Sequence, residues 1–156
     1  MNNIKKINDC CPVFKREFWD EKTHIWNEKK FIKELMPTLF HMPFPPTINK
    51  SATRMWKQAE AASAMPEAMD EMMMLFHDPS AFKTEILLEV TKEVSEAKNN
   101  VTLSGIFVSK VFEGSYGSAP KFMKEMAEFL ATRGQRALDY YVHYAYCPKC
   151  AQETGP

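Results

Sequence analysis

VTLSGIFVSKVF, the stretch at residues 101–112, is the most regular strand pattern in the chain. Its β-branched and aromatic residues favour an extended backbone. A turn containing Gly114 follows, and Ser118 with Pro120 can begin a helix behind that turn. Apolar residues then recur at helical spacing as far as Gly134, which can end the helix. This part of the sequence predicts a strand, a turn and a helix in succession.

An aromatic segment at residues 138–146 predicts one more strand behind this helix. By alternation, Tyr141 and His143 share one face of that strand, while Tyr140 and Tyr144 share the other. A flat apolar ring with a polar tip suits the wall of a ligand site. The alternative is a half-buried strand whose tyrosine hydroxyls simply reach water.

The sequence before residue 101 has a similar order of elements. The predicted elements are a proline-interrupted strand at residues 31–44, a helix from Asn49 or Ser51 to about Ala64, a strand at 72–76, a turn at 77–80 and an alternating strand at 82–91. In the alternating strand, Ile86 and Leu88 fall on one face, and Glu85 and Glu89 on the other.

These elements predict an α+β fold built from two similar halves, at about residues 31–92 and 101–150. The first half has the order β-α-β-β, and the second lacks its last strand after Cys150. An antiparallel sheet with two helices would then have an open edge. A second copy of the chain, the N-terminal arm at residues 1–30, or a continuation of a truncated chain could cover that edge. Residues 31–156 are expected to form one domain, on which the arm packs.

Composition excludes several classes of partner. The 156 residues carry a formal net charge of zero, whereas a nucleic-acid partner requires a surplus of Lys and Arg. The chain lacks the run of about eighteen apolar residues that a membrane span needs. Its polar start does not resemble a secretory signal, so a cytoplasmic protein without nucleic-acid or membrane partners is expected.

The four cysteines are then expected to be thiols or metal ligands rather than disulfides. Cys147 and Cys150 form a C-x-x-C motif, and Cys10 and Cys11 could complete a zinc site if the arm folds back. The alternatives are a redox pair or two free thiols in a terminal turn. Zinc is the one cofactor that the sequence suggests.

A set of short motifs extends over nearly the whole chain. They are Cys10-Cys11-Pro12-Val13-Phe14, Trp19-Asp20, Trp26, His41-Met42-Pro43, Leu103-Ser104-Gly105, Phe112-Glu113-Gly114 with Tyr116, and Cys147-Pro148-Lys149-Cys150. Taken together, the sequence resembles the GyrI-like (gyrase-inhibitor-like) small-molecule-binding family. It is most similar to a short stand-alone group often labelled "hydrolase".

The resemblance implies two β-α-β-β units related by a pseudo-two-fold axis, with a groove between them for an apolar or cationic ligand. Relatives serve as effector-binding domains of drug-sensing regulators. Some hydrolyse strained cyclopropane compounds with a glutamate and aromatic residues in the groove. The present sequence departs from that pattern, because its last strand contains no glutamate and only Asp139 as an acid.

Three hypotheses follow, and the first is a binding domain for a small molecule. Its expected ligand-binding residues are Trp56, Glu89, Phe107, Tyr116, Tyr141 and Tyr144. The second is a small hydrolase in which Glu113 or Glu89 activates water and Tyr141 or His143 donates a proton. That hypothesis requires a carboxylate inside the groove, near a Tyr or His. The third is an interaction module stabilised by thiols or zinc, in which the cysteines matter and the groove does not.

Overall fold

The computed structural model describes residues 16–39, 42–43, 45–67, 73–80, 83–114 and 118–143. Its helices and strands are, in chain order, α1 (Arg16–Trp19), β1 (Lys22–Leu39), β2 (Met42–Pro43), α2 (Pro45–Ala61), β3 (Met74–Ser80), β4 (Lys83–Glu89), β5 (Asn99–Ser109), α3 (Ala119–Thr132) and β6 (Val142–His143). The predicted α+β class is confirmed, and the main elements follow the predicted order.

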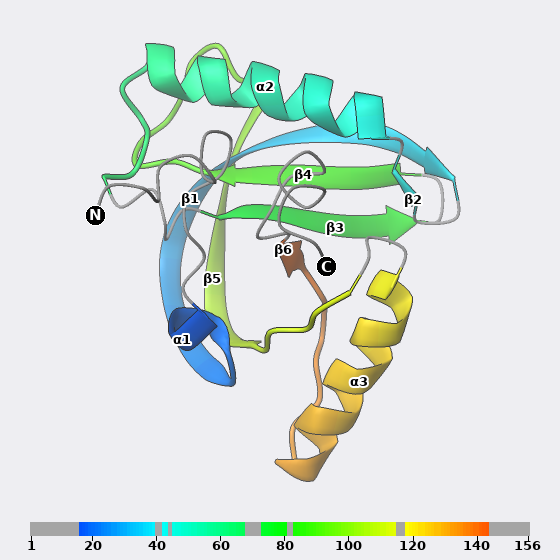
Figure 1. The fold of residues 1–156 in the computed structure, drawn as a ribbon. Helices are drawn as coiled ribbons and strands as arrows, with labels where there is room; N and C mark the ends of the chain where they lie inside the picture. The colour runs from blue at the N-terminus through cyan, green and yellow to red at the C-terminus, as the bar shows by residue number, and fades with distance from the viewer. Residues whose placement is uncertain are drawn as a thin grey trace, which may run out of the picture.

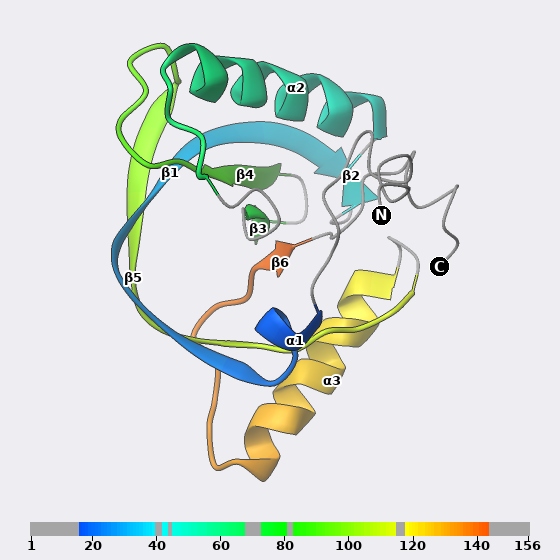
Figure 2. The ribbon, with the colours of Figure 1, turned by 60° about the vertical axis from the view of Figure 1, so that its left-hand side comes forward.

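The strands form one antiparallel sheet in the order β2-β1-β4-β3-β6, and β5 pairs with β1 (Figure 1). β1 is the strand that joins both parts of this sheet. Its first half pairs only with β5, and its second half pairs with β4. β1 and β5 curl around the remaining strands, so the sheet has a concave inner face and a convex outer face (Figure 2).

The outer face carries the main core together with α2. Ile32 and Met36 of β1 and Ile86 of β4 are buried there against Met55 and Ala59 of α2. The inner face carries a second buried cluster of Phe31, Met73, Leu75 and Leu87. Neighbouring residues of β1 and β4 alternate between the two clusters, as the period of two in a strand requires. The predicted alternation of β4 is confirmed.

The secondary structure differs from the prediction at several boundaries. β1 begins at Lys22, inside the predicted N-terminal arm. The sequence did not reveal this start, because an extra residue between Trp26 and Lys29 interrupts the alternation of the strand. β3 continues through residues 77–80, which were predicted to be a turn, and a pairing irregularity between His77 and Ser80 accommodates Pro79.

Two further boundaries also differ from the prediction. α2 begins at Pro45, before the predicted caps, since proline is tolerated in the first turn of a helix. β6 is described only as Val142–His143, and the later part of the predicted strand lies outside the described residues.

A charged pair fixes α2 to the outer face. The side chain of Glu34 in β1 is only 2 % exposed, and its two carboxylate oxygens accept hydrogen bonds from Nε and Nη2 of Arg54. Such a two-point contact satisfies the carboxylate and sets the position of the helix along the strand. If the arginine is removed, a buried charge remains without its partner.

Replacing Arg54 by alanine should therefore lower the free energy of unfolding by about 2–3 kcal/mol, because the carboxylate of Glu34 loses its partner. Lys57→Ala, on an exposed position of the same helix, should change it by less than about 0.5 kcal/mol. Urea unfolding of both variants measures the difference. Equal stabilities would show that the pair does not anchor α2.

Candidate functional site on the inner face

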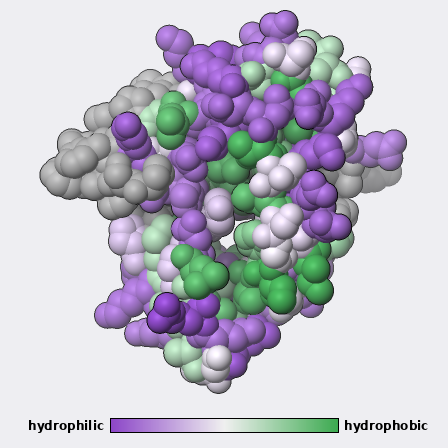
Figure 3. Space-filling model, turned by 180° about the vertical axis from the view of Figure 1, so that it is seen from behind, coloured by the Kyte–Doolittle hydropathy of each residue, from purple (hydrophilic) through white to green (hydrophobic). Residues whose placement is uncertain are grey.

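The inner face of the curled sheet collects aromatic side chains from distant parts of the sequence. Trp19, Trp26 and Tyr141 pack against its buried cluster. They come from the α1 segment, from β1 and from the segment just before β6. Seen from the back, the molecule is hollowed at its centre, and hydrophobic residues gather around the hollow (Figure 3).

The rings on this face form a continuous network. The ring centroids of Trp26 and Phe107 are 4.2 Å apart, and those of Phe107 and Tyr141 are 6.3 Å apart in an edge-on arrangement. Tyr141 in turn stacks on His77 at 4.9 Å. Gly105 pairs directly with Trp26 across the strands, so no side chain competes with the indole there. Its φ of +137° is also one that other residues rarely adopt.

A chain of ionisable groups lies next to this network, with His77 at its centre. His77 and Glu85 are paired across β3 and β4, and Nδ1 of the histidine lies 2.9 Å from Glu85 Oε1. Nε2 lies 2.9 Å from both carboxylate oxygens of Asp139. Lys33 Nζ donates to the other oxygen of Glu85 at 3.2 Å. His77 and Glu85 are largely buried, whereas the Asp139 side chain is 54 % exposed.

The charges around His77 favour the protonated form of this histidine. Burial alone would lower the pKa of His77, but the hydrogen bonds and charges of Glu85 and Asp139 outweigh burial and raise it. Burial would likewise raise the pKa of Glu85, yet its hydrogen bonds from His77 and Lys33 lower it. Burial, together with Asp139 and Glu85, raises the pKa of Tyr141, so its hydroxyl stays protonated at neutral pH.

A second carboxylate of the inner face belongs to Glu89. It forms an ion pair of 2.7 Å with Lys29, and it accepts a hydrogen bond of 3.1 Å from the backbone amide of Met73. These contacts connect β1, β4 and the start of β3. The negative charge of Glu89 is thus already balanced by a neighbouring lysine.

His24 and Ser109 form a hydrogen-bonded pair at the β1–β5 end of the same face. Nε2 of His24 lies 2.8 Å from Ser109 Oγ. The serine hydroxyl itself donates to the backbone oxygen of Trp19 at 2.5 Å. Because a hydroxyl has one proton, this arrangement makes His24 the donor to Ser109. Burial, with the charge of Lys29, lowers the pKa of His24. The pair therefore ties α1 to β5 rather than activating the serine.

The structure brings four of the predicted site residues onto this face: Phe107, Tyr141, Glu89 and His143. His143 pairs with Leu75 in the sheet, and its Nδ1 lies 3.1 Å from the backbone oxygen of Met74. Its burial lowers the pKa in spite of that hydrogen bond. The neutral imidazole of His143 is hydrogen-bonded to the backbone of β3, and this contact stabilises the position of β6.

Other predicted site residues lie elsewhere. Trp56 is on α2, which packs on the outer face, so it does not meet Tyr141. The Glu113 side chain is 72 % exposed and forms an ion pair of 2.8 Å with Arg16. The remaining predicted residues lie outside the described part of the chain: Tyr116, Tyr144, Cys10, Cys11, Cys147 and Cys150.

Sequence reasoning missed His77, Lys33 and the pairing of Glu85 with His77. The signal was present, since Leu75 and His77 are two residues apart and must share a strand face if the strand continues. Pro79 and Ser80 favoured a turn instead. Asp139 was noted as an acid, but nothing in the sequence indicates that it meets a histidine 62 residues away.

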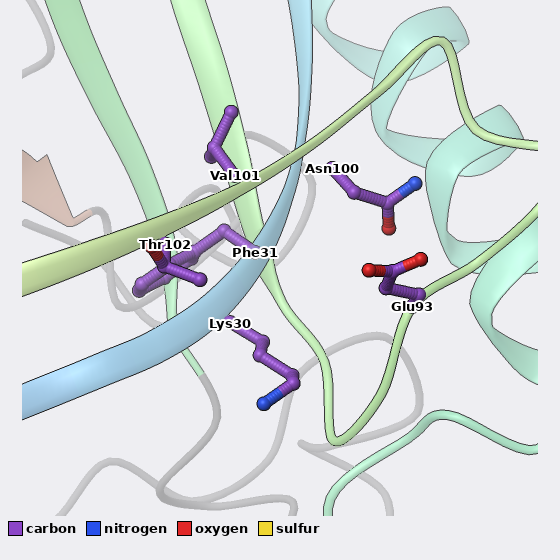
Figure 4. A pocket seen from close by; sticks show the side chains of 6 residues that line it. All are labelled: Lys30, Phe31, Glu93, Asn100, Val101 and Thr102. Carbon is purple, nitrogen blue, oxygen red and sulfur yellow. The ribbon is translucent and has the colours of Figure 1, made fainter.

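A small pocket shares Phe31 with the inner-face cluster, but neither the ring network nor the groups around His77 line it. Its volume is about 160 Å³, and Lys30, Phe31, Glu93, Asn100, Val101 and Thr102 line it (Figure 4). Pockets for drug-sized ligands are about 300 Å³ or larger. The side chain of Asn100 is also occupied, since it bonds the backbone of Val94. This pocket does not suit the predicted ligand.

Among the described residues, no group of three or more His, Cys, Asp or Glu side chains could hold a metal ion. The predicted zinc ligands are outside that part, so zinc binding stays a prediction. Over the same residues, no helix is long and apolar enough to cross a membrane.

Fold and site together define a small α+β protein with acid–base groups beside an aromatic surface. Over residues 1–156 the chain matches the family described as "Bacterial hydrolase", and it belongs to that family. No curated protein and no solved structure matches the chain. The family match supports the hydrolase-labelled group of the predicted resemblance, whereas the likeness to GyrI-like domains stays a prediction.

The three described histidines should titrate differently in an NMR experiment. The pKa of His77 should lie above the ordinary value of about 6.5, and those of His24 and His143 below it. Asp139→Asn should lower the pKa of His77, because one of the two neighbouring charges is lost. A His77 pKa that is ordinary, or unchanged in Asp139→Asn, would contradict the geometry.

The same shift links stability to pH. Folding raises the pKa of His77, so the histidine contributes its full stabilisation below the unfolded value of about 6.5. The contribution is lost as the pH rises through the folded pKa. The difference in unfolding free energy between wild type and His77→Gln should therefore shrink as the pH rises from below about 6.5 through the raised pKa of the folded state.

Proposed function

We propose that the protein is a hydrolase that binds an apolar small molecule on its inner face and uses His77 as the general base for water. The hydrogen bond between Glu85 and His77, beside the Tyr141 ring, is the observation that carries this proposal. Membership of a family named for hydrolysis supports the class of reaction.

Glu85 positions the base. It accepts the proton of His77 Nδ1, which leaves Nε2 as the atom for proton transfer. Lys33 in turn holds the second oxygen of Glu85, so the carboxylate stays ionised and fixed. Such a base with its orienting acid is the recurrent core of hydrolytic sites.

Asp139 controls access to Nε2. Asp139 is exposed, unlike His77 and Glu85, and it lies just before β6 rather than within the sheet. When its carboxylate moves away from Nε2, a water molecule takes that position. Loss of the neighbouring charge also lowers the pKa of His77, because Asp139 is one of the groups that raise it. The same movement thus exposes Nε2 and favours the neutral form of the base.

The reaction is then a direct addition of water to an acyl carbon followed by loss of the leaving group, without a covalent enzyme intermediate. Nε2 accepts a proton from water, and the water oxygen forms a bond to an electrophilic carbon of the substrate. The bond from that carbon to the leaving group breaks, and His77 returns the proton to the leaving group. The protonated hydroxyl of Tyr141 is placed to donate a hydrogen bond to the oxygen that gains negative charge.

The charges of the inner face favour an uncharged substrate over a cationic one. Glu89 is paired with Lys29, and Glu85 with Lys33 and His77. The contact surface is instead supplied by the rings of Trp26, Phe107 and Tyr141. Flat aromatic walls bind apolar molecules through area and stacking.

Binding without turnover is the second candidate function. The ring network supports it, since it offers a wall for a ligand whether or not chemistry follows. It is also what the resemblance to GyrI-like effector-binding domains implies. Measuring binding and turnover separately distinguishes the two. The interaction-module hypothesis rests on cysteines outside the described residues and gains no support from the inner face.

Hydrolysis of neutral p-nitrophenyl esters with short acyl chains provides a direct assay. His77→Gln should lower kcat/KM by about 10²–10⁴-fold, the usual contribution of a general base. Glu85→Gln should lower it in the same direction, because it no longer holds His77. The activity should rise with pH through the pKa of His77, and Asp139→Asn should move that inflection to lower pH.

Ser109→Ala is the matched control, because it removes a hydroxyl from the same face without touching His77. It should keep most of the activity and lose about 1 kcal/mol of stability with its hydrogen bonds. Full activity in His77→Gln, or loss of activity in Ser109→Ala at normal stability, would contradict the proposed base. Ester binding without any turnover would favour the second candidate.

A further inference from the structure

β5 has one edge paired with β1, and no second partner strand among the residues that the structure describes. The strand is eleven residues long, with the sequence NNVTLSGIFVS, and contains neither a charged residue nor a proline. Proteins that keep an edge strand in solvent usually protect it with lysine, proline or a covering helix. α2 packs over β1 and β4, away from this edge (Figure 1).

An exposed apolar pair lies beside this edge on the outer face. Ile25 of β1 and Ile106 of β5 are directly paired across the strands, and they are 80 % and 73 % exposed. Their exposure contrasts with that of Ile32, further along β1, which is completely buried under α2. Together they form an exposed apolar pair beside an unprotected strand, a surface that a pairing partner would cover.

We propose that β5 pairs with β5 of a second copy of this chain, antiparallel and about a two-fold axis, to give a continuous sheet across a homodimer. An antiparallel strand pair is self-complementary, as a two-fold interface requires. The neutral edge permits this pairing, because no like charges meet when the strand faces itself. A strand carrying lysines would repel its own copy.

The symmetry also accounts for the isoleucines. A two-fold axis perpendicular to the sheet keeps the outer faces of both copies on the same side. Ile106 of each β5 then approaches the other copy's strand on that side, which reduces its exposure to water. On the opposite side, Phe107 of each copy extends the aromatic inner face towards the axis. The dimer does not depend on the proposed hydrolysis, since it rests on the edge and outer face alone.

Sedimentation equilibrium over a wide range of protein concentration tests the dimer. The wild type should have twice the chain mass of 18.0 kDa and should dissociate on dilution. Ile106→Lys should be monomeric at all concentrations, because each copy would place a charged side chain against the apolar outer face of the other copy's strand. Leu138→Lys, at a position 94 % exposed and away from β5, is the matched control and should stay dimeric.

Hydrogen exchange identifies the surface involved. The β5 amides that point away from β1 should exchange at least about tenfold faster in the monomeric Ile106→Lys than in the wild-type dimer, while those of β4 stay protected in both. A monomeric wild type would overturn the proposal. Protection of the outward-pointing β5 amides in that monomer would assign the edge to another segment of the same chain. A dimer that persists in Ile106→Lys would also overturn the proposal, since it would place the interface elsewhere.

Discussion

One extra residue in β1, between Trp26 and Lys29, has consequences for most of the structure. Trp26 pairs with Gly105 and Lys29 with Leu103, so β1 takes three steps where β5 takes two. Glu28 adopts a φ of +53° in this bulge, and its amide donates to Ser104 Oγ. Because the bulge shifts the alternation, Trp26 before it and Phe31 after it face the same side. The added bend and twist let β1 pair with β5 at one end and with β4 at the other.

The chemistry of the inner face depends on this curvature. A flat sheet would keep β5 far from β3, whereas the curled sheet brings Phe107 of β5 to Tyr141 and, through it, to His77 of β3. The apolar rings limit the water around His77 and its two carboxylates, and this strengthens the hydrogen bonds between them. A histidine between two carboxylates in such surroundings is held in a fixed orientation, and its exposed partner Asp139 occupies Nε2. The proton transfer that we propose requires Asp139 to move away from that atom.

Much of the fold could be predicted from the sequence, because its strands and helices obey simple periods. The alternation of β4, the strand pattern of β5 and the apolar helix α3 were all readable from local residues, although Ser118 makes no side-chain cap hydrogen bond at the start of α3. The start of β1 was not, because the bulge breaks the period and the charged residues around Glu28 hide the remaining pattern. The end of β3 was missed because Pro79 signals a turn, and only pairing with β4 keeps it extended.

The candidate site was less predictable than the fold. Phe107, Tyr141 and Glu89 could be named because aromatic and acidic residues on a strand face are visible locally. The meeting of His77 with Asp139 is a tertiary contact across 62 residues, and no local pattern encodes it. Trp56 was predicted to line the ligand site, yet α2 carries it to the opposite face of the sheet. Trp19 and Trp26, which were not predicted as ligand-binding residues, pack on the inner face instead.

That separation of the tryptophans offers the most direct test of the inner face as the binding site. The chain has three tryptophans: Trp19 and Trp26 pack on the inner face, and Trp56 lies on α2. Their indole N–H signals can be followed by NMR during titration with a neutral aromatic alcohol, the product of an ester substrate. The structure predicts that the signals of Trp19 and Trp26 shift together while that of Trp56 stays in place. A shift of Trp56 alone, with Trp19 and Trp26 unchanged, would contradict the assignment of the site.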